Sequence, residues 1–327
     1  MRVMVTGGAG FLGGHICEEL IRQVSDLEVL HVIDDLSSGS MENLIDATML
    51  CEEYDIDWCF FGGDVADPWP PGCSGYDLII HAASPASPID HMRDAWATIS
   101  ANLLGARNAV GALRSDGLGR ILFLSTSEVY GDPECSPQGE DYHGRVNING
   151  PRAPYDEGKR VTEAYLSNLD PETGVEVRIA RIFNTYGPRM RPSDGRVVSS
   201  FITQALAGED LTVHGDGSQT RSFCWYEDTV RGLVQLALAT NPDLDRTPVN
   251  IGNPDEISVL ELAEEVRRIV PGAGQIRHTS VMPDDPTNRR PDISRAWDML
   301  KWRPQVTWRV GVYSMVEWFS SQNKKEA

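Results

Sequence analysis

The fold of this chain is decided by the stretch Val3-Met4-Val5-Thr6-Gly7-Gly8-Ala9-Gly10-Phe11-Leu12-Gly13-Gly14-His15. The residues before Gly7 predict a short apolar strand, and a helical pattern follows the glycines to about Arg22. Gly7, Gly10 and Gly13 have the spacing G-x-x-G-x-x-G. Glycine is needed in such a turn because the backbone must approach a pyrophosphate at the N-terminus of the helix. A plain glycine-rich turn is the alternative, but the flanking strand and helix favour a dinucleotide site.

A second strand is predicted at 27–33, where a βαβ unit requires one. It ends at Asp34, which follows Gly13 at roughly the 20-residue distance of a carboxylate that binds the adenosine ribose. A carboxylate here favours NAD over NADP, since it would repel the 2′-phosphate. The loop from Leu36 to Ser40 contains no Arg that would reverse this preference.

Further strands are predicted at 58–61, 76–81, 120–124 and 175–182, with helices between them, including a long one from Asp90 to Arg114. Such alternation predicts a parallel sheet with right-handed crossovers. We therefore expect an α/β fold with a doubly wound, Rossmann-like parallel sheet and a smaller C-terminal α/β domain that binds the substrate. The NAD-binding domain is expected to span 1–183 and to be rejoined by about 222–250. The substrate-binding domain is then expected to comprise 184–221 and 251–327.

Candidate site residues lie where the predicted strands end, because ligand sites of such sheets collect at the carboxyl ends of the strands. The candidates for the dinucleotide are Gly7, Gly10, Phe11, Leu12, Gly13, Asp34, Asp64, Val65 and Ala82. The polar run Ser125-Thr126-Ser127-Glu128 follows the fifth strand. It is either catalytic or a loop with local hydrogen bonds, and its position favours catalysis.

Tyr155 and Lys159 lie one helical turn apart on the same face of a predicted helix. An ammonium beside a phenol favours the phenolate and lowers the phenol's pKa, as would a bound cationic nicotinamide. The pair is therefore suited to bind the cofactor and to remove a proton from an alcohol while the cofactor takes the hydride. Alone, the pair also fits an ordinary amphipathic helix. The dinucleotide turn upstream favours the catalytic interpretation.

Arginines gather in the second half of the chain, at 189, 191, 196, 221, 289 and 290. The planar guanidinium matches diphosphate and carboxylate groups, so the set indicates a site for an anionic substrate. For any single Arg, an ordinary surface ion pair is the alternative.

The composition is that of an ordinary soluble globular protein, with 41% hydrophobic and 24% charged residues among 327. A net charge of −19 predicts repulsion of nucleic acid and of anionic membranes. The six Cys lack metal-ligand spacing, so we expect reduced thiols and no metal site. The first strand leaves no room for a signal peptide and no apolar run has membrane-spanning length, so we expect a cytoplasmic protein.

The glycine turn, Asp34, Thr126 and Tyr155-x-x-x-Lys159 together resemble the extended short-chain dehydrogenase/reductases. Within that family the chain is most similar to the UDP-glucuronate decarboxylases, also called UDP-xylose synthases. The similar motifs run nearly end to end: HAASPASP (81–88), STSEVYGDPE (125–134), GPRA (150–153), YDEGKR (155–160), RIFNTYGPRM (181–190), DGRVV (194–198) and GSQTR (217–221). The chain differs at Pro154 and Trp225, where those enzymes often have Cys and Tyr, and between Ser38 and Cys59.

The resemblance implies a redox-neutral reaction of a UDP-sugar, with NAD as cofactor and with a homodimer as the active form. It implies that Tyr155 takes the proton of the sugar 4-hydroxyl, that Thr126 binds the same oxygen, and that Lys159 supports Tyr155. Carbon dioxide then leaves from a 4-keto intermediate, with Glu128 and Arg221 acting around C5 and the carboxylate. The product is UDP-xylose or UDP-4-keto-pentose. The implied substrate-binding residues are Ser84, Ser127, Asn184, Arg189, Arg196, Arg221 and Arg289.

Three other activities remain open on this fold. A 4,6-dehydratase needs an acid for the departing C6 hydroxyl, and usually has Asp-Glu where this chain has Ser127-Glu128. A 4-epimerase needs only the first oxidation and a rotated intermediate. A dinucleotide-sensing protein would have no need for Thr126, Tyr155 and Lys159 together.

Overall fold

The computed structural model describes residues 1–280 and 288–326. A parallel sheet with the strand order β11-β6-β5-β4-β1-β2-β3 forms its larger part. The strands are β1 (Arg2–Thr6), β2 (Val29–Asp34), β3 (Asp57–Gly62), β4 (Leu78–His81), β5 (Arg120–Thr126), β6 (Glu176–Ile182) and β11 (Pro248–Ile251). The predicted doubly wound, Rossmann-like fold is therefore confirmed. Strand β11 was not among the predicted strands.

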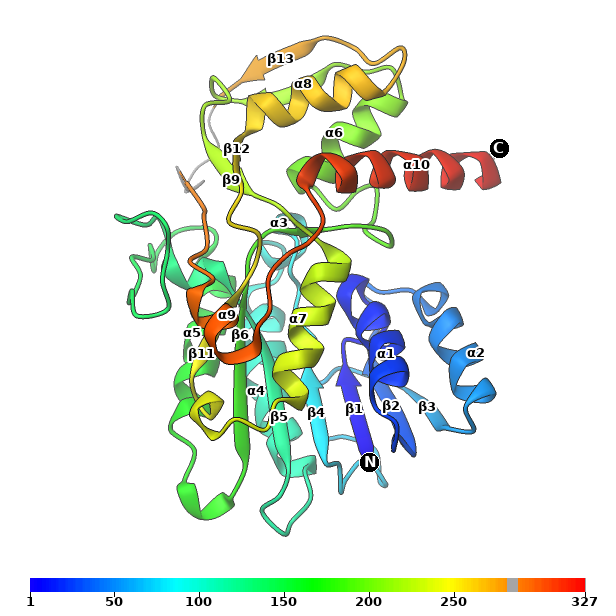
Figure 1. Ribbon diagram of the computed structural model, residues 1–327, viewed down its shortest axis with the longest axis vertical. Helices are drawn as coiled ribbons and strands as arrows, with labels where there is room; N and C mark the ends of the chain where they lie inside the picture. Colours follow the sequence, from blue (N-terminus) through cyan, green and yellow to red (C-terminus); the bar gives the residue numbers. More distant parts are fainter. Residues whose placement is uncertain (281–287, 327) are drawn as a thin grey trace.

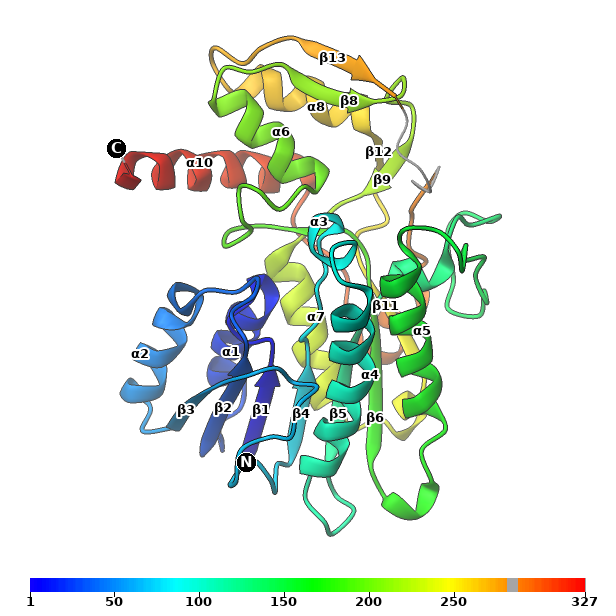
Figure 2. The same ribbon diagram turned by 180° about the vertical axis from the view of Figure 1, so that it is seen from behind.

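Helices cover both faces of this sheet, as its apolar strands require. One face carries α1 (Phe11–Gln23), α2 (Ile45–Glu53) and α7 (Tyr226–Leu238), as Figure 1 shows. The other face carries α4 (Ala95–Ala112) and α5 (Ala153–Ser167), which lie side by side in Figure 2. Short 3-10 turns connect several elements: η1 (Met41–Leu44), η2 (Ser127–Tyr130), η3 (Pro171–Thr173) and η4 (Pro242–Leu244).

The prediction of one long helix from Asp90 to Arg114 is wrong, because the helix is interrupted after His91. A short helix, α3 (Pro88–His91), is followed by a separate start of α4. Asp94 has extended backbone angles, and its carboxylate accepts a hydrogen bond of 2.9 Å from the amide of Ala97. This N-cap satisfies a free amide at the start of α4, so the helix begins there.

A second lobe lies beyond the carboxyl ends of the sheet strands (Figure 1). It contains α6 (Val197–Leu206), β8 (Leu211–His214), β9 (Thr220–Ser222), β12 (Glu256–Ser258), α8 (Val259–Ile269), β13 (Ile276–Thr279) and α10 (Trp308–Glu326). Strands β7 (Thr185–Tyr186) and β10 (Cys224–Trp225) pair with each other, and α9 (Ser294–Leu300) packs against β11 of the large sheet. The second lobe has an apolar core of its own, with Phe201, Leu262 and Met315 at its centre.

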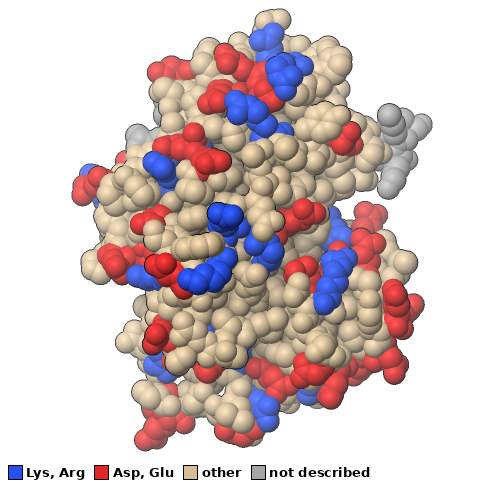
Figure 3. Space-filling view, viewed as in Figure 1, with Lys and Arg blue, Asp and Glu red and all other residues tan. Residues whose placement is uncertain are grey.

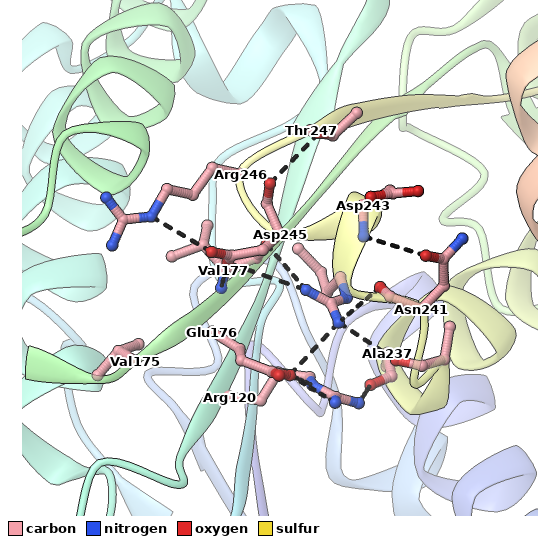
Figure 4. Close-up of polar contacts among 12 residues, drawn as sticks. Arg120, Val175, Glu176, Val177, Ala237, Asn241, Asp243, Asp245, Arg246 and Thr247 are labelled. Atoms are coloured by element: carbon pink, nitrogen blue, oxygen red, sulfur yellow. Dashed lines mark hydrogen bonds and ion pairs between the residues drawn. The ribbon is translucent and has the colours of Figure 1, made fainter. Parts of the chain in front are cut away.

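A cluster of polar contacts lies at the other end of the sheet from the second lobe, where β5 and β6 begin (Figure 4). Arg178 of β6 is fully buried, and its Nη2 lies 3.3 Å from Glu176 and donates to the carbonyl of Ala239 at 3.2 Å. Arg120 of β5 also binds Glu176, at 2.5 Å, and donates to the carbonyl of Ala237. These contacts join β5 and β6 to the end of α7.

Within the described residues, no helix is both long and apolar enough to cross a membrane.

Candidate active site

The glycine turn has the geometry that a dinucleotide requires. Gly7 has a φ of +68°, and a Cβ at Gly13 would lie 2.1 Å from the carbonyl oxygen of Gly7. Only glycine can occupy both positions. Asp34 accepts hydrogen bonds from the amides of Ala9 at 3.0 Å and Leu36 at 2.8 Å, which fixes its carboxylate beside the turn. The residues of this cradle therefore fit NAD.

A cavity of about 990 Å³ lies between the carboxyl edge of the sheet and the second lobe. It is lined by all the residues named for the cofactor, for catalysis and for substrate binding, from Gly7 to Arg289, whereas Arg290 of the arginine set donates to the carbonyl of Pro254 at 3.2 Å. The structure thus brings together residues that are far apart in the chain, while their individual roles stay predictions.

Tyr155 lies in the wall of this cavity, next to Thr126 and Lys159. Burial raises the pKa of Tyr155 to about 12, although a hydrogen bond with Thr126 acts in the opposite direction. Lys159 donates to the carbonyl of Leu124 at 2.6 Å, and its Nζ lies 5.8 Å from the centroid of the Tyr155 ring. Burial also lowers the pKa of Lys159 to about 7. In the protein alone, burial sets the direction of the Tyr155 pKa, and its lowering by Lys159 and by a bound nicotinamide stays a prediction.

Glu128 is held between two guanidinium groups. Its carboxylate lies 2.8 Å from Arg152 and 3.0 Å from Arg289. Arg289 also donates to the carbonyls of Ser127 and Gly131, so it fixes the whole turn after β5. Burial alone would raise the pKa of Glu128, but Arg289 and Arg152 hold it at about 2. Glu128 is thus a carboxylate at every working pH.

The pKa of Asp156, beside Tyr155 on α5, is raised, in contrast to the lowered pKa of Glu128. Burial, and then the neighbouring charge of Glu128, raise the pKa of Asp156 to about 7. Its Oδ1 is buried and has no hydrogen-bond partner in the described part of the chain. Two nearby carboxyl groups therefore differ in charge near neutral pH.

Two of the predicted substrate arginines make strong contacts within the protein. Arg189 lies 2.5 Å from Glu18 and 2.7 Å from Asp46. In this structure it therefore forms ion pairs within the protein, which is the alternative to a substrate contact. Arg196 binds Asp194 at 2.5 Å.

On one face of the molecule, the charged side chains near the junction of the lobes differ in sign from those at the lower margin (Figure 3). On the face shown in Figure 3, Lys and Arg side chains gather at mid-height, where the lobes meet, while Asp and Glu crowd the lower margin. Arg221, which lines the cavity, is 9% exposed. Eight Lys and Arg and seven Asp and Glu side chains line the cavity, so it is less acidic than the protein as a whole.

Among the cavity residues that were not predicted from the sequence, Arg152 contacts Glu128 and His91 contacts Tyr155. Arg152 was part of a recognised motif, but no role was derived for it. His91 falls inside the helix that was wrongly predicted to be continuous, and nothing in its neighbourhood indicated that it would reach Tyr155. Both positions result from long-range packing.

A doubly wound sheet, a dinucleotide turn and a Tyr-x-x-x-Lys pair beside Thr126 are typical of NAD-dependent enzymes of the extended short-chain dehydrogenase/reductase type. The model of the NAD dependent epimerase/dehydratase family matches residues 3–252. The chain belongs to this family.

Similar proteins cover almost the whole chain. UDP-glucuronic acid decarboxylase 3 of Arabidopsis thaliana is 45% identical, over 98% of this chain and 89% of its own length. UDP-glucuronic acid decarboxylase 1 of Danio rerio is 43% identical, over 100% of this chain and 74% of its own length. Among solved structures, the dTDP-glucose 4,6-dehydratase of Streptomyces venezuelae, solved with NAD bound, has a TM-score of 0.85 at 27% identity and covers 99% of this chain and 98% of its own.

Proposed function

We propose that this protein is a UDP-glucuronate decarboxylase, which converts UDP-glucuronate to UDP-xylose or UDP-4-keto-pentose with no net redox change. The observation that carries the proposal is the cationic cluster of Arg152, Arg289 and Arg221 around Glu128, in the same cavity as Tyr155. A substrate carboxylate can be bound there while the base acts at C4. The similarity to two decarboxylases over nearly the full chain supports this choice of activity.

The first step is the oxidation of the sugar at C4. Bound NAD supplies the acceptor for the C4 hydride and later returns it. The phenolate form of Tyr155, which a bound cationic nicotinamide would favour, accepts the proton of the 4-hydroxyl, and Thr126 orients the same oxygen. Lys159, anchored on the carbonyl of Leu124, places a positive charge near the reactive phenolate of Tyr155 when Lys159 is protonated.

The second step is the loss of carbon dioxide. The 4-ketone is β to the C6 carboxylate, so the electrons of the breaking C5–C6 bond are delocalised into the ketone as an enolate. Arg221 binds the carboxylate before it leaves. The enolate then takes a proton at C5 from a water that Glu128, which is ionised, orients, and the hydroxide left behind takes a proton from the solvent. Reduction at C4 completes the cycle.

The remaining predicted residues serve binding. Gly7, Gly10, Gly13 and Asp34 hold NAD, and Asn184 and Arg196 face the nucleotide part of the substrate. A dehydratase is disfavoured because Ser127, buried in the cavity wall, is a poor acid for a leaving hydroxyl.

Mass analysis of the sugar nucleotide tests this proposal. The enzyme is incubated with UDP-glucuronate and substoichiometric NAD⁺, and with UDP-glucose as the matched substrate that lacks a carboxylate. We expect a UDP-pentose from the first and no dehydrated product from the second. Unchanged UDP-glucuronate mass, or a 4-keto-6-deoxy sugar from UDP-glucose, would contradict the proposal.

We also propose that the active form is a cytoplasmic homodimer that pairs through α4 and α5. Trp96 on α4 is 68% exposed and Val161 on α5 is 41% exposed, which supports an apolar contact surface on this face. All six Cys are free, as in a reducing compartment. Light scattering should give a dimer mass, and a Trp96→Glu, Val161→Glu double variant should give a monomer. A monomeric wild-type protein at micromolar concentration would contradict this.

A further inference from the structure

The imidazole of His91 lies flat against the phenol ring of Tyr155. The two ring centroids are 5.0 Å apart and the planes are inclined by 16°. His91 is 1% exposed and Tyr155 is 8% exposed, so the contact is almost free of water. His91 also lines the cavity. It is the last residue of α3.

The His91 ring is held by packing rather than by a hydrogen bond at Nδ1. This atom is buried and has no partner in the described part of the chain. Burial lowers the pKa of His91 to about 4, and Arg152 acts in the same direction, against the smaller opposite effects of Glu128 and Asp90. The imidazole is therefore neutral near pH 7. It acts on Tyr155 as an aromatic surface and not as a cation.

Three polar contacts hold α3 in place. Ser87 caps the helix by accepting a hydrogen bond of 3.2 Å from the amide of Asp90, and Thr98 of α4 donates to the carbonyl of His91 at 3.2 Å. The Asp90 carboxylate pairs with Arg191, in the segment that leads to the second lobe. These contacts set the place of the imidazole independently of Tyr155.

We propose that His91 is a positioning residue for the base: its ring keeps the phenol of Tyr155 in the orientation that directs the hydroxyl to Thr126 and to the sugar 4-hydroxyl. A stacked aromatic contact restricts rotation of the phenol ring. Small displacements of a reacting group can cost up to about 100-fold in rate. The sugar in this proposal rests on the proposed function, whereas the contact between the two rings does not.

Two matched variants separate positioning from other roles. His91→Leu fills similar space without an aromatic ring, and His91→Phe keeps the ring and removes both nitrogens. We expect kcat of His91→Leu to fall about 10- to 100-fold with KM for UDP-glucuronate within about 2-fold of wild type. We expect His91→Phe to recover kcat to within about 3-fold of wild type.

Other kinetic outcomes would overturn the proposal. A normal kcat in His91→Leu would mean that the ring is not needed. An equal loss in His91→Phe would mean that a nitrogen and not the aromatic surface is required. A raised KM with normal kcat would make His91 a substrate-binding residue.

A second measurement does not depend on the substrate. In protein with ¹³C-labelled tyrosine rings, the Tyr155 signal is assigned from its absence in Tyr155→Phe. The imidazole ring current should shift this signal in wild type and, in similar degree, the phenyl ring should shift it in His91→Phe. In folded His91→Leu the signal should move toward that of a free tyrosine. An unmoved signal would overturn the proposal, whereas wild-type inactivity on UDP-glucuronate would defeat only the proposed function.

Discussion

The ammonium of Lys159 donates a hydrogen bond of 2.6 Å to the main-chain carbonyl of Leu124, at the carboxyl end of β5. This contact fixes the lysine to the sheet rather than to the phenol of Tyr155. The centroid of the Tyr155 ring is 5.8 Å from the ammonium, so Lys159 acts on the phenol through its charge. The hydrogen bond of Lys159 therefore goes to the backbone of β5, and in our proposal the phenol oxygen of Tyr155 binds the substrate.

Tyr155→Phe keeps the ring and its contact with His91 but removes the proton acceptor. We expect turnover of UDP-glucuronate to fall at least about 100-fold, which is the usual contribution of a general base. Calorimetry should find the affinities for NAD⁺ and UDP-glucuronate nearly unchanged. Near-normal turnover would show that another group removes the proton.

The two guanidinium groups beside Glu128 predict a particular pH dependence. Because the pKa of Glu128 is held at about 2, wild-type kcat should show no ionisation of this group above about pH 4. Arg152→Met removes one of the two close cations, so the pKa should rise and an acid limb should appear in the pH profile of kcat. An acid limb in wild type that disappears in Glu128→Gln would contradict the account.

Asp156 predicts a pH-dependent effect on stability. Folded Asp156 keeps its proton to about pH 7, whereas an unfolded Asp loses it near pH 4. The folded state binds more protons between these values, so the stabilising contribution of Asp156 is lost as the pH rises through this window. Asp156→Asn lacks this loss. Its free energy of unfolding relative to wild type should rise between pH 4 and pH 8, by at most about 4 kcal/mol.

Urea denaturation at about pH 5 and about pH 8 measures this difference. Glu157→Gln, one position along the helix and partly exposed, is the matched control and should show little pH dependence. An equal effect of Asp156→Asn at both pH values would contradict the prediction.

The part of the site that the sequence predicted depends on local patterns. The turn from Gly7 to Gly13 and the carboxylate at Asp34 have spacings that one βαβ unit imposes. The pairing of Tyr155 and Lys159 requires only that both residues lie on one face of a helix, one turn apart. Such features can be read from neighbouring residues without knowledge of the rest of the chain.

The part that the sequence could not predict depends on tertiary contacts. The break before α4 is set by the cap at Asp94, a polar residue that also fits a helix interior. Arg189 meets Asp46 across 143 positions of the chain, so its ion pairs could not be separated from a substrate contact in advance. The stacking of His91 on Tyr155 likewise requires the position of α3 over the cavity.

Arg178 lies remote from the cavity, so its substitution is expected to change stability and not turnover. Arg178→Ala removes a fully buried side chain and its contacts with Glu176 and the carbonyl of Ala239, so we expect a loss of about 2–4 kcal/mol in the free energy of unfolding. Arg178→Met fills most of the space and should lose at least about 1 kcal/mol less. Urea denaturation measures both values, and kcat should be unchanged. Equal losses in the two variants would show that charge and not volume decides.

The central claim is that oxidation at C4 serves to release carbon dioxide from C5. The most direct measurement is NMR of the reaction of uniformly ¹³C-labelled UDP-glucuronate in D₂O with substoichiometric NAD⁺. The account predicts labelled carbon dioxide and bicarbonate in step with a UDP-pentose that carries one deuterium at C5. A product that keeps all six sugar carbons, with an inverted C4 and no released carbon dioxide, would contradict it and identify a 4-epimerase.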